Sequence, residues 1–356
     1  MKKFVCRFPQ PATSTPIYCG SDILHQCLPA DLYGKYSSVL AVVDETVYRL
    51  HRLLLSSTLS GVRVYRFPSG ERYKTHRQLF ALLEWLMSNQ ADRRSLLIAI
   101  GGGVVTDITG LAASCYMRGI DTILIPTTLL GQIDAAIGGK TAINYKGIKN
   151  IIGSFHPPRL VVCDQHFLET LPRRSIKDGL VEAVKLFAAY DAESFARYSA
   201  RIAGLIKGEG LETLVADAVR LKVEIVNRDP WEQGLRRVLN FGHTTGHAYE
   251  TLTCSSHGRA IALGMLVALR LSRLHLDLSA ADHDKIGEAI LSIYRRYNTN
   301  RVTPQTLWQK IKHDKKCVGR EISYILVDKP GSYREKPITY QQFKRAWYDT
   351  REWYSR

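Results

Sequence analysis

Residues 96–110 read LLIAIGGGVVTDITG, and this stretch is the strongest single indication of the fold. The apolar run Leu96–Ile100 predicts a buried strand, and the segment from Gly103 to Arg118 predicts a helix. Glycines at such a junction let backbone N–H groups approach a pyrophosphate, whose negative charge the helix N-terminus favours. The spacing differs from the GxGxxG fingerprint of Rossmann domains, so a tight strand-to-helix turn without a ligand stays an alternative.

The chain on both sides of this stretch alternates strand-like and helix-like segments. Further strands are predicted at residues 38–43, 62–67, 123–125 and 160–163. Residues 75–87 carry leucines at positions 79, 82, 83 and 86, which is the spacing of a helix with one buried face. Strands that alternate with helices predict a mainly parallel, Rossmann-like sheet with helices on both faces.

The pattern changes from about residue 175 onward, where long helical stretches dominate. Helices are predicted at residues 176–189, 211–227, 243–252, 259–276 and 281–297, and residues 322–327 are the only later strand candidate. We therefore expect an α/β domain over residues 1–172 and an all-helical domain over residues 173–356.

Composition narrows the classes of protein and of partner. The chain has 356 residues, of which 45% are hydrophobic, and this fraction excludes a mainly disordered protein. Its 49 Lys and Arg against 33 Asp and Glu give a net charge of +16, which predicts an anionic partner. That partner could be nucleic acid, a membrane surface or a phosphorylated small molecule. We expect no nucleic acid, because zinc-finger spacing, an RNP aromatic signature and an arginine-rich tail are all missing from the sequence.

The sequence also indicates a compartment. No run approaches 18 consecutive apolar residues, so we expect no membrane span and no membrane partner. The residues before Pro9 contain no apolar run of useful length, so we expect no signal peptide. Seven cysteines are scattered without a CxxC pair. We interpret them as reduced thiols of a cytoplasmic protein.

A group of histidines and one glutamate is a candidate metal site. His243 and His247 are four residues apart, so on a helix they share one face. Together with Glu182 and His257 they offer two or three imidazoles and a carboxylate, which suits catalytic Zn²⁺ with an open coordination position. The alternative is that these are helix-face histidines with local hydrogen bonds.

Cationic residues gather around predicted loops. Lys140 and Thr141 follow two glycines, a plausible cradle for a phosphate or carboxylate, although the spacing is not that of a P-loop. Further cations along the chain are Lys149, Lys185, Lys222, Arg236, Lys315 and Lys316. Taken singly, each could also be a solvated surface residue.

These segments resemble the 3-dehydroquinate synthase family, which belongs to the sugar phosphate cyclase superfamily. The resemblance covers about residues 40–327, and its blocks follow one another in a single order. The blocks are GGGVVTDITG (101–110), MRG (117–119), PTTLLGQIDAAIGGKTAIN (126–144), KNIIGSF (149–155), GLVEAVK (179–185), GLRRVLNFGHTTGH (234–247), HGRAIALGM (257–265) and DKK (314–316).

The resemblance implies a fold and a reaction. It implies an NAD-binding α/β domain followed by a helical metal- and substrate-binding domain, usually in a homodimer. The cofactors would be NAD and a divalent metal, Zn²⁺ with Co²⁺ as the alternative. The substrate would be 3-deoxy-D-arabino-heptulosonate 7-phosphate, converted to 3-dehydroquinate and phosphate in the shikimate pathway of aromatic amino-acid synthesis. The implied steps are transient oxidation by NAD, β-elimination of phosphate, re-reduction and an intramolecular aldol addition.

The resemblance also implies roles for individual residues. Glu182, His243 and His257 would be the metal ligands, and His247 would contact substrate and relay a proton. NAD would be held by Asp44, Glu71, Lys74, Gly102, Gly103, Val104, Asp107, Thr127, Thr128, Lys140 and Lys149. The implied catalytic residues are Lys140, Lys185, Lys222, Arg236, Asn240 and His247. Substrate would be bound by Asp134, Asn150, one of Lys315 and Lys316, and Arg118, which would reach into the phosphate site of a partner subunit.

Several positions depart from the usual pattern of the family. Thr106 stands where glycine is common, Ala135–Ala136 replace two serines, and Pro230 stands where an acid is usual. Arg259 follows the ligand His257 by two positions, where an acid is usual. A cation beside a metal ligand could weaken metal binding, unless its long side chain points to solvent.

Three alternatives stay open. A related cyclase that acts on a heptulose phosphate or glucose 6-phosphate would replace Lys222, Asn240 or His247, and this chain keeps all three. A metal-dependent polyol dehydrogenase would produce net NADH and would not need the lysines. A basic binding module without catalysis predicts no metal triad.

Overall fold

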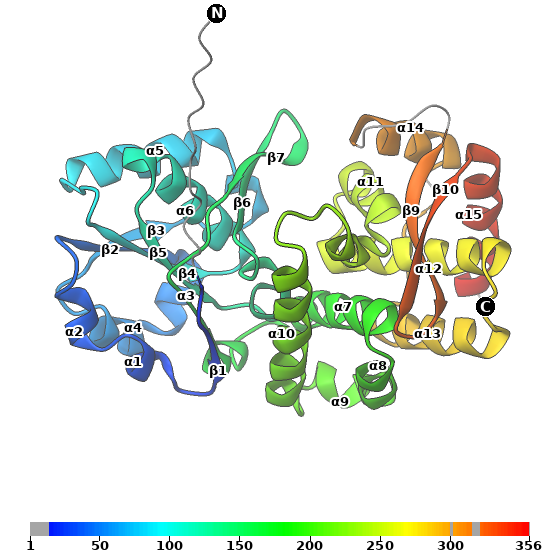
Figure 1. The fold of residues 1–356 in the computed structure, drawn as a ribbon, viewed down its shortest axis with the longest axis horizontal. Coiled ribbons are helices and arrows are strands. Elements are labelled where there is room, and N and C mark those ends of the chain that lie inside the picture. The colour runs from blue at the N-terminus through cyan, green and yellow to red at the C-terminus, as the bar shows by residue number, and fades with distance from the viewer. Residues whose placement is uncertain (1–13, 300–301, 315–320, 356) are drawn as a thin grey trace, which may run out of the picture.

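The computed structural model describes residues 14–299, 302–314 and 321–355, which form two domains side by side (Figure 1). Lys315 and Lys316, expected near the substrate, lie outside the described residues. Within the described ranges, no helix combines the length and the apolar character needed to cross a bilayer.

The N-terminal domain is built on a six-stranded sheet in which every pairing is parallel. In spatial order its strands are β1 (Ile17–Gly20), β8 (Leu160–Asp164), β5 (Asp121–Pro126), β4 (Leu96–Gly101), β2 (Val39–Asp44) and β3 (Arg63–Phe67). The five predicted strands are confirmed. The edge strand β1 was not predicted, because it is short and only partly buried.

The order of the strands locates a ligand-binding edge. The chain steps outward from β2 to β3, and then crosses back to β4 and continues to β5 on the other side. Parallel sheets bind ligands outside the carboxyl ends of the strands at such a reversal. Here β2 and β4 are paired with Val43 opposite Ile100, so Asp44 and Gly101 lie next to each other at that edge.

Helices cover both faces of this sheet, as its alternating side chains require. On one face, α5 (His76–Ser88) and α6 (Gly103–Cys115) pack against Leu40, Val42 and Leu97. The other face holds Ala41, Val43 and Ile98, which pack against residues of α1 and α4. The helices on that side are α1 (Leu24–Cys27), α2 (Ala30–Tyr33), α3 (Glu45–Leu50) and α4 (Arg52–Thr58). The predicted helix from Gly103 ends earlier than Arg118, because Met117 and Arg118 adopt positive φ angles.

Two features between β5 and β8 bring further residues to the carboxyl edge of the sheet. A π-helical turn at Gly131–Ala135 presents Asp134. The antiparallel hairpin of β6 (Lys140–Tyr145) and β7 (Ile148–Phe155) then packs on α6 and lies on the side that faces the helical domain (Figure 1).

The C-terminal domain is not all-helical, so that prediction was wrong in one respect. β9 (Ile322–Lys329) and β10 (Ser332–Ile338) form an antiparallel hairpin that packs against α12. The candidate at residues 322–327 is therefore a strand, whereas β10 escaped prediction because it is charged and mostly exposed. The helices of this domain are α7 (Arg173–Tyr190), α8 (Ala192–Ser199), α9 (Ile202–Ile206), α10 (Leu211–Arg228), α11 (His243–Thr253), α12 (His257–His275), α13 (Ala280–Ile293), α14 (Pro304–Asp314) and α15 (Tyr340–Ser355).

The helix α12 is the centre of this domain. Residues 260–269 are all buried, as expected of a helix that is surrounded on every side. It packs against α7, α11, α13, α15 and β9. The five helices predicted from periodicity are present, although α13 ends at Ile293 rather than at residue 297. The core of the domain thereby fixes the first residues of α11 and α12, which are His243 and His257.

Candidate active site

A cleft of about 670 Å³ lies between the two domains. It includes the carboxyl edge of the sheet and the first residues of α11 and α12. Among the residues predicted to form the site, those that line it are Asp44, Glu71, Lys74, Gly102, Gly103, Val104, Asp107, Thr127, Thr128, Asp134, Lys140, Lys149, Asn150, Lys185, Lys222, Arg236, Asn240, His243, His247 and His257. Segments far apart in the sequence therefore meet in one place.

The glycine-rich turn forms a close-fitting edge of this cleft. A Cβ atom on Gly102 would lie 3.0 Å from Thr128 Cγ2, and one on Gly103 would lie 3.3 Å from Ala135 Cβ. The helix α6 begins at Gly103, and the first N–H groups of a helix have no partner within it. The turn can therefore receive the phosphates of a dinucleotide, which is the chemistry expected from the sequence.

Lys74 connects three segments next to this turn. Its side chain is buried, and its ammonium pairs with Asp107 of α6 and donates a hydrogen bond to Asn150 Oδ1 at 2.5 Å. Asn150 lies on β7 with a φ angle of +53°, and its backbone N–H donates to Asn144 Oδ1 at 2.9 Å. These contacts fasten the β6–β7 hairpin to the dinucleotide side of the cleft.

Paired charges occupy the centre of the cleft. Asp134 pairs with Lys222, and its other oxygen lies 3.9 Å from Lys185 Nζ. Burial raises the pKa of Asp134, but Lys185 and Lys222 more than offset this and lower it to about 2. Lys222 is buried as well, and burial lowers the pKa of its ammonium. The carboxylate thus holds two cations together at a site from which water is largely excluded.

Arg236 is held beside this cluster by backbone groups. Its guanidinium donates hydrogen bonds to Pro230 O at 2.6 Å and to Gly138 O at 3.2 Å. Its own backbone N–H donates to Asp229 Oδ2 at 2.9 Å. Arg236 is only 2% exposed, so its planar, permanently charged group has a fixed orientation toward the cleft.

Glu182, His243 and His257 bring one donor atom each to a common point. The three donor atoms lie within 4.8 Å of one another. Glu182 Oε1 is 3.3 Å from His257 Nε2 and 3.7 Å from His243 Nε2. Among the described residues these three form the one group of this kind, and it does not include His247. The spacing in the sequence did not decide which of the histidines are the metal donors. The geometry selects His243 and His257 and leaves out His247.

The donor set suits a divalent metal. Two imidazole nitrogens and one carboxylate oxygen leave a coordination position open, as in catalytic zinc sites. Glu182 is buried, and its Oε2 pairs with Lys185, so Oε1 is the oxygen that faces the two imidazoles. Burial lowers the pKa of His243 and so favours the neutral, metal-binding form, whereas Lys185 and His243 keep the pKa of Glu182 low despite its burial. Two carboxylates raise the pKa of His257 to about 10 against the effect of burial, so the pocket favours positive charge.

Comparison with known proteins identifies the family. A model of the N-terminal part of 3-dehydroquinate synthase matches residues 64–178, and a model of the C-terminal part matches residues 179–317. The chain belongs to the 3-dehydroquinate synthase family. The 3-dehydroquinate synthase of Campylobacter concisus (strain 13826) is 42% identical over 308 residues, which cover 85% of this chain and 87% of that protein. That of Solibacter usitatus is 35% identical over 354 residues, which cover 95% and 99%.

Solved structures extend this comparison. The 2-epi-5-epi-valiolone synthase of Streptomyces hygroscopicus, described with NAD⁺ and Zn²⁺ bound, superimposes with a TM-score of 0.88 at 28% identity. That match covers 98% of this chain and 99% of the other. A 2-deoxy-scyllo-inosose synthase has a TM-score of 0.83 at 24% identity over 94% and 96% of the two chains, and it shows the shared fold alone.

Sequence reasoning missed Glu232, an acid that lines the cleft. Its carboxylate pairs with Lys140 and accepts a hydrogen bond from Asn240 Nδ2 at 2.8 Å. The sequence offered only its position as a hint, because Glu232 stands in the loop before Arg236, two positions after the departure at Pro230, and belongs to no motif. The structure therefore supplies an acid from this loop in spite of that proline.

Two arginines singled out by sequence lie away from the metal donors. Arg118 is exposed in a turn and does not line the cleft of its own chain. Arg259 is exposed too, and its guanidinium lies 5.0 Å from the centre of the Tyr294 ring. His257 and Arg259 are two positions apart on α12, so they leave the helix in different directions. The departure from the family pattern at Arg259 thus places no cation within the donor group.

Proposed function

We propose that this protein is a 3-dehydroquinate synthase, which converts 3-deoxy-D-arabino-heptulosonate 7-phosphate into 3-dehydroquinate and phosphate. The observation that carries the proposal is a single cleft in which a dinucleotide cradle, three metal donors and a cluster of cations meet. Membership of the family supports it, as does the identity of 42% and 35% to two relatives of that name.

Two bound groups are part of the proposal. Glu182, His243 and His257 would hold Zn²⁺ or Co²⁺, and a metal at this position polarises the sugar hydroxyl that is to be oxidised. The cradle around Gly102 and Gly103 would hold NAD, which supplies reversible hydride transfer without net oxidation. The related 2-epi-5-epi-valiolone synthase with NAD⁺ and Zn²⁺ supports this pair of groups.

The chain's own cations account for the choice of substrate. Lys140, Lys185, Lys222 and Arg236 line one cleft, and the substrate carries both a phosphate and a carboxylate. In a site that excludes water, fixed cations offset the charge that develops on an enolate and on a leaving phosphate. Asp134 keeps two of these ammonium groups in place. His247, whose ring centre is 5.0 Å from that of His243, would relay a proton beside the metal.

The choice of sugar phosphate is tested by comparing substrates. With NAD⁺ and Zn²⁺ present, we expect turnover of 3-deoxy-D-arabino-heptulosonate 7-phosphate, followed as release of phosphate and formation of 3-dehydroquinate. Sedoheptulose 7-phosphate and glucose 6-phosphate lack the carboxylate and should be poor substrates. Efficient turnover of either, with none of the first, would show instead that the protein is another sugar phosphate cyclase.

We propose in addition that the enzyme works as a homodimer. Four apolar side chains of β7, Ile148, Ile151, Ile152 and Phe155, are between 37% and 57% exposed in the single chain. An exposed apolar strand of this kind is typical of a contact surface. The turn that contains Arg118 adjoins the end of β7, because Gly119 lies against His156. A second copy on this surface would bring its cleft near Arg118.

The remaining proposals concern compartment and partners. We propose a cytoplasmic enzyme whose partners are its sugar phosphate substrate, NAD and a metal, with no nucleic acid and no membrane. The cysteines of the described ranges are free thiols, which supports a reducing compartment. The gathering of cations in one cleft supports a small anionic ligand as the specific partner.

A further inference from the structure

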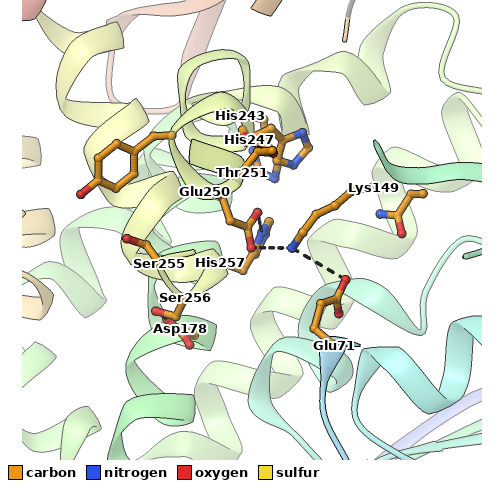
Figure 2. A network of polar contacts seen from close by, with 12 residues as sticks. Glu71, Lys149, Asp178, His243, His247, Glu250, Thr251, Ser255, Ser256 and His257 are labelled. Carbon is orange, nitrogen blue, oxygen red and sulfur yellow. Dashed lines mark hydrogen bonds and ion pairs between the residues drawn. The ribbon is translucent and has the colours of Figure 1, made fainter. Parts of the chain in front are cut away.

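Glu250 is not among the residues assigned to the metal, the dinucleotide or the substrate. It lies on α11, seven residues after His243, and its side chain is 5% exposed. Both of its oxygens are occupied, because Oε2 lies 3.3 Å from His257 Nδ1 and Oε1 accepts a hydrogen bond from Lys149 Nζ at 2.6 Å. Figure 2 shows this carboxylate between the histidine ring and the lysine.

The contact with His257 fixes which ring nitrogen keeps its proton when a metal binds to the other. An ionised carboxylate only accepts hydrogen bonds, so Nδ1 must donate to Glu250. The opposite nitrogen, Nε2, faces Glu182 Oε1 at 3.3 Å within the donor group, so it is the nitrogen that would release its proton to bind a metal. His243 needs no such side chain, because its Nδ1 lies 3.3 Å from the backbone oxygen of Phe241. Glu250 is thus the side chain that orients one of the two imidazoles.

The contact with Lys149 carries the network across the cleft. Lys149 belongs to β7 of the N-terminal domain, and its ammonium also lies 3.7 Å from Glu71 Oε1 (Figure 2). Glu71 and Lys149 both line the dinucleotide side of the cleft. Glu250 therefore links the imidazole of His257, one of the three metal donors, to the dinucleotide side of the cleft.

We propose that Glu250 is a positioning residue that holds His257 in the tautomer and orientation required for metal binding. The inference deepens the proposed function and rests on it, because it takes Glu182, His243 and His257 as metal ligands. Carboxylates that accept from the remote nitrogen of a ligating histidine commonly contribute about 10- to 100-fold to metal affinity.

The test is the affinity of the metal-free protein for Zn²⁺, measured by competition with a chromophoric chelator without substrate. Glu250→Gln should weaken Zn²⁺ binding by about 10-fold or more, because a neutral amide accepts more weakly from Nδ1 and can also present its NH₂ to the ring. With Co²⁺ in place of Zn²⁺, the absorption bands of the metal should change in the same variant. Unchanged affinity and an unchanged spectrum would overturn the proposal.

Glu71→Gln is the matched control, because it removes the same charge from the same network without touching His257. We expect this variant to bind Zn²⁺ with the affinity of the wild type. An equal loss in both variants would mean that general electrostatics, and not the contact, sets the affinity, and the proposal would fail. If Glu250→Gln does not fold, Glu250→Asp keeps the charge but shortens the reach to Nδ1, and it should show the same direction of change.

The outcome separates this inference from the proposed function. A wild-type protein that binds no Zn²⁺ would contradict the metal site itself. If the wild type binds Zn²⁺ and Glu250→Gln binds it equally tightly, only the role of Glu250 would be contradicted.

Discussion

At the scale of single residues, the cleft relies on cations that are held by acids rather than on isolated charges. Asp134 holds Lys185 and Lys222, and Glu232 holds Lys140. Buried or partly buried ammonium groups would otherwise lose their charge, since burial lowers their pKa. The arrangement keeps the cleft cationic and ready for an anionic substrate.

Lys140 should make the activity depend on pH. Partial burial in the cleft, together with the neighbouring Arg236 and Lys222, lowers the pKa of its ammonium to about 8. Its positive charge is therefore present below about pH 8 and is lost as the pH rises through that value. Since kcat/KM reports the free enzyme, we expect it to fall about tenfold for each pH unit above about 8.

Lys140→Arg provides the control for this prediction, because a guanidinium does not titrate in this range. We expect kcat/KM of Lys140→Arg, measured over a pH series, to lack the decline above about pH 8 that is due to loss of the Lys140 charge. A decline that is parallel in wild type and variant would assign the titration to another group.

Replacement of His243 tests the metal donors directly. His243→Ala removes one of the three converging atoms and leaves a carboxylate and a single imidazole. We expect loss of bound metal, measured by elemental analysis, together with loss of activity. Thr251→Ala near the C-terminal end of the same helix removes no donor atom of the group and should retain both metal and activity. Full activity in His243→Ala would refute the ligand assignment.

At the scale of elements, the site depends on the close approach of α11 and α12. A Cβ atom on Gly264 would lie 2.0 Å from Gly242 O and 2.8 Å from Gly246 N. Gly242 itself has a φ angle of +79° and directly precedes His243. The backbones of the two helices touch here because glycine has no side chain to keep them apart. This contact sets the position of His243.

Gly264→Ala should therefore disturb both stability and site. Backbone atoms cannot move aside as a flexible side chain can, so we expect a loss of about 1–3 kcal/mol or more in the free energy of unfolding by urea. Zn²⁺ binding should weaken as α11 shifts. Gly204→Ala is the control, because the atom closest to its new Cβ would be Oε2 at the flexible end of the Glu209 side chain, 2.7 Å away. Its effect should stay below about 1 kcal/mol.

Elements with a clear period were predictable from sequence, and elements defined by their neighbours were not. The unbroken apolar run Leu96–Ile100 predicts its strand, and the spacing of the leucines of α5 predicts its helix. β1 is half-exposed at an edge of the sheet, and β10 is charged. Neither therefore has an alternation of apolar and polar residues that is clear enough to predict a strand. The β6 strand was interpreted only as a phosphate cradle around Lys140, and its pairing with β7 was missed.

The candidate site shows the same division. Motifs brought Glu182, His243 and His257 together as metal candidates, but spacing alone could not exclude His247, which is four residues from His243 on the same helix. Glu232 and Glu250 belong to no motif. Their partners come from distant segments, so only the fold shows that each of these acids contacts a lysine.

At the scale of the whole molecule, the proposed dimer makes a prediction about mixed subunits. Arg118→Ala and His243→Ala should each be inactive as homodimers, because every cleft lacks either the partner's arginine or a metal ligand. After mixing with subunit exchange, each heterodimer regains one complete cleft. Random pairing should then restore about a quarter of the wild-type activity, since half of the dimers are mixed. No recovery, with exchange verified by mass, would contradict the shared site.

The net charge of +16 suggested several anionic partners at first. The structure places Lys74, Lys140, Lys149, Lys185, Lys222 and Arg236 around one cleft, beside metal donors and a dinucleotide cradle. A clustered set of cations indicates a specific small anion, whereas charge spread over a surface would indicate only general attraction.

We expect oxidation in this cleft to be transient and to lead to elimination of phosphate. The most direct measurement follows 3-dehydroquinate, phosphate and NADH together in one reaction that contains Zn²⁺, excess 3-deoxy-D-arabino-heptulosonate 7-phosphate and less NAD⁺ than substrate. We predict equal amounts of 3-dehydroquinate and phosphate, many turnovers for each NAD⁺ and no accumulation of NADH. Accumulation of NADH in step with product, or oxidation without release of phosphate, would contradict the account and point to a dehydrogenase.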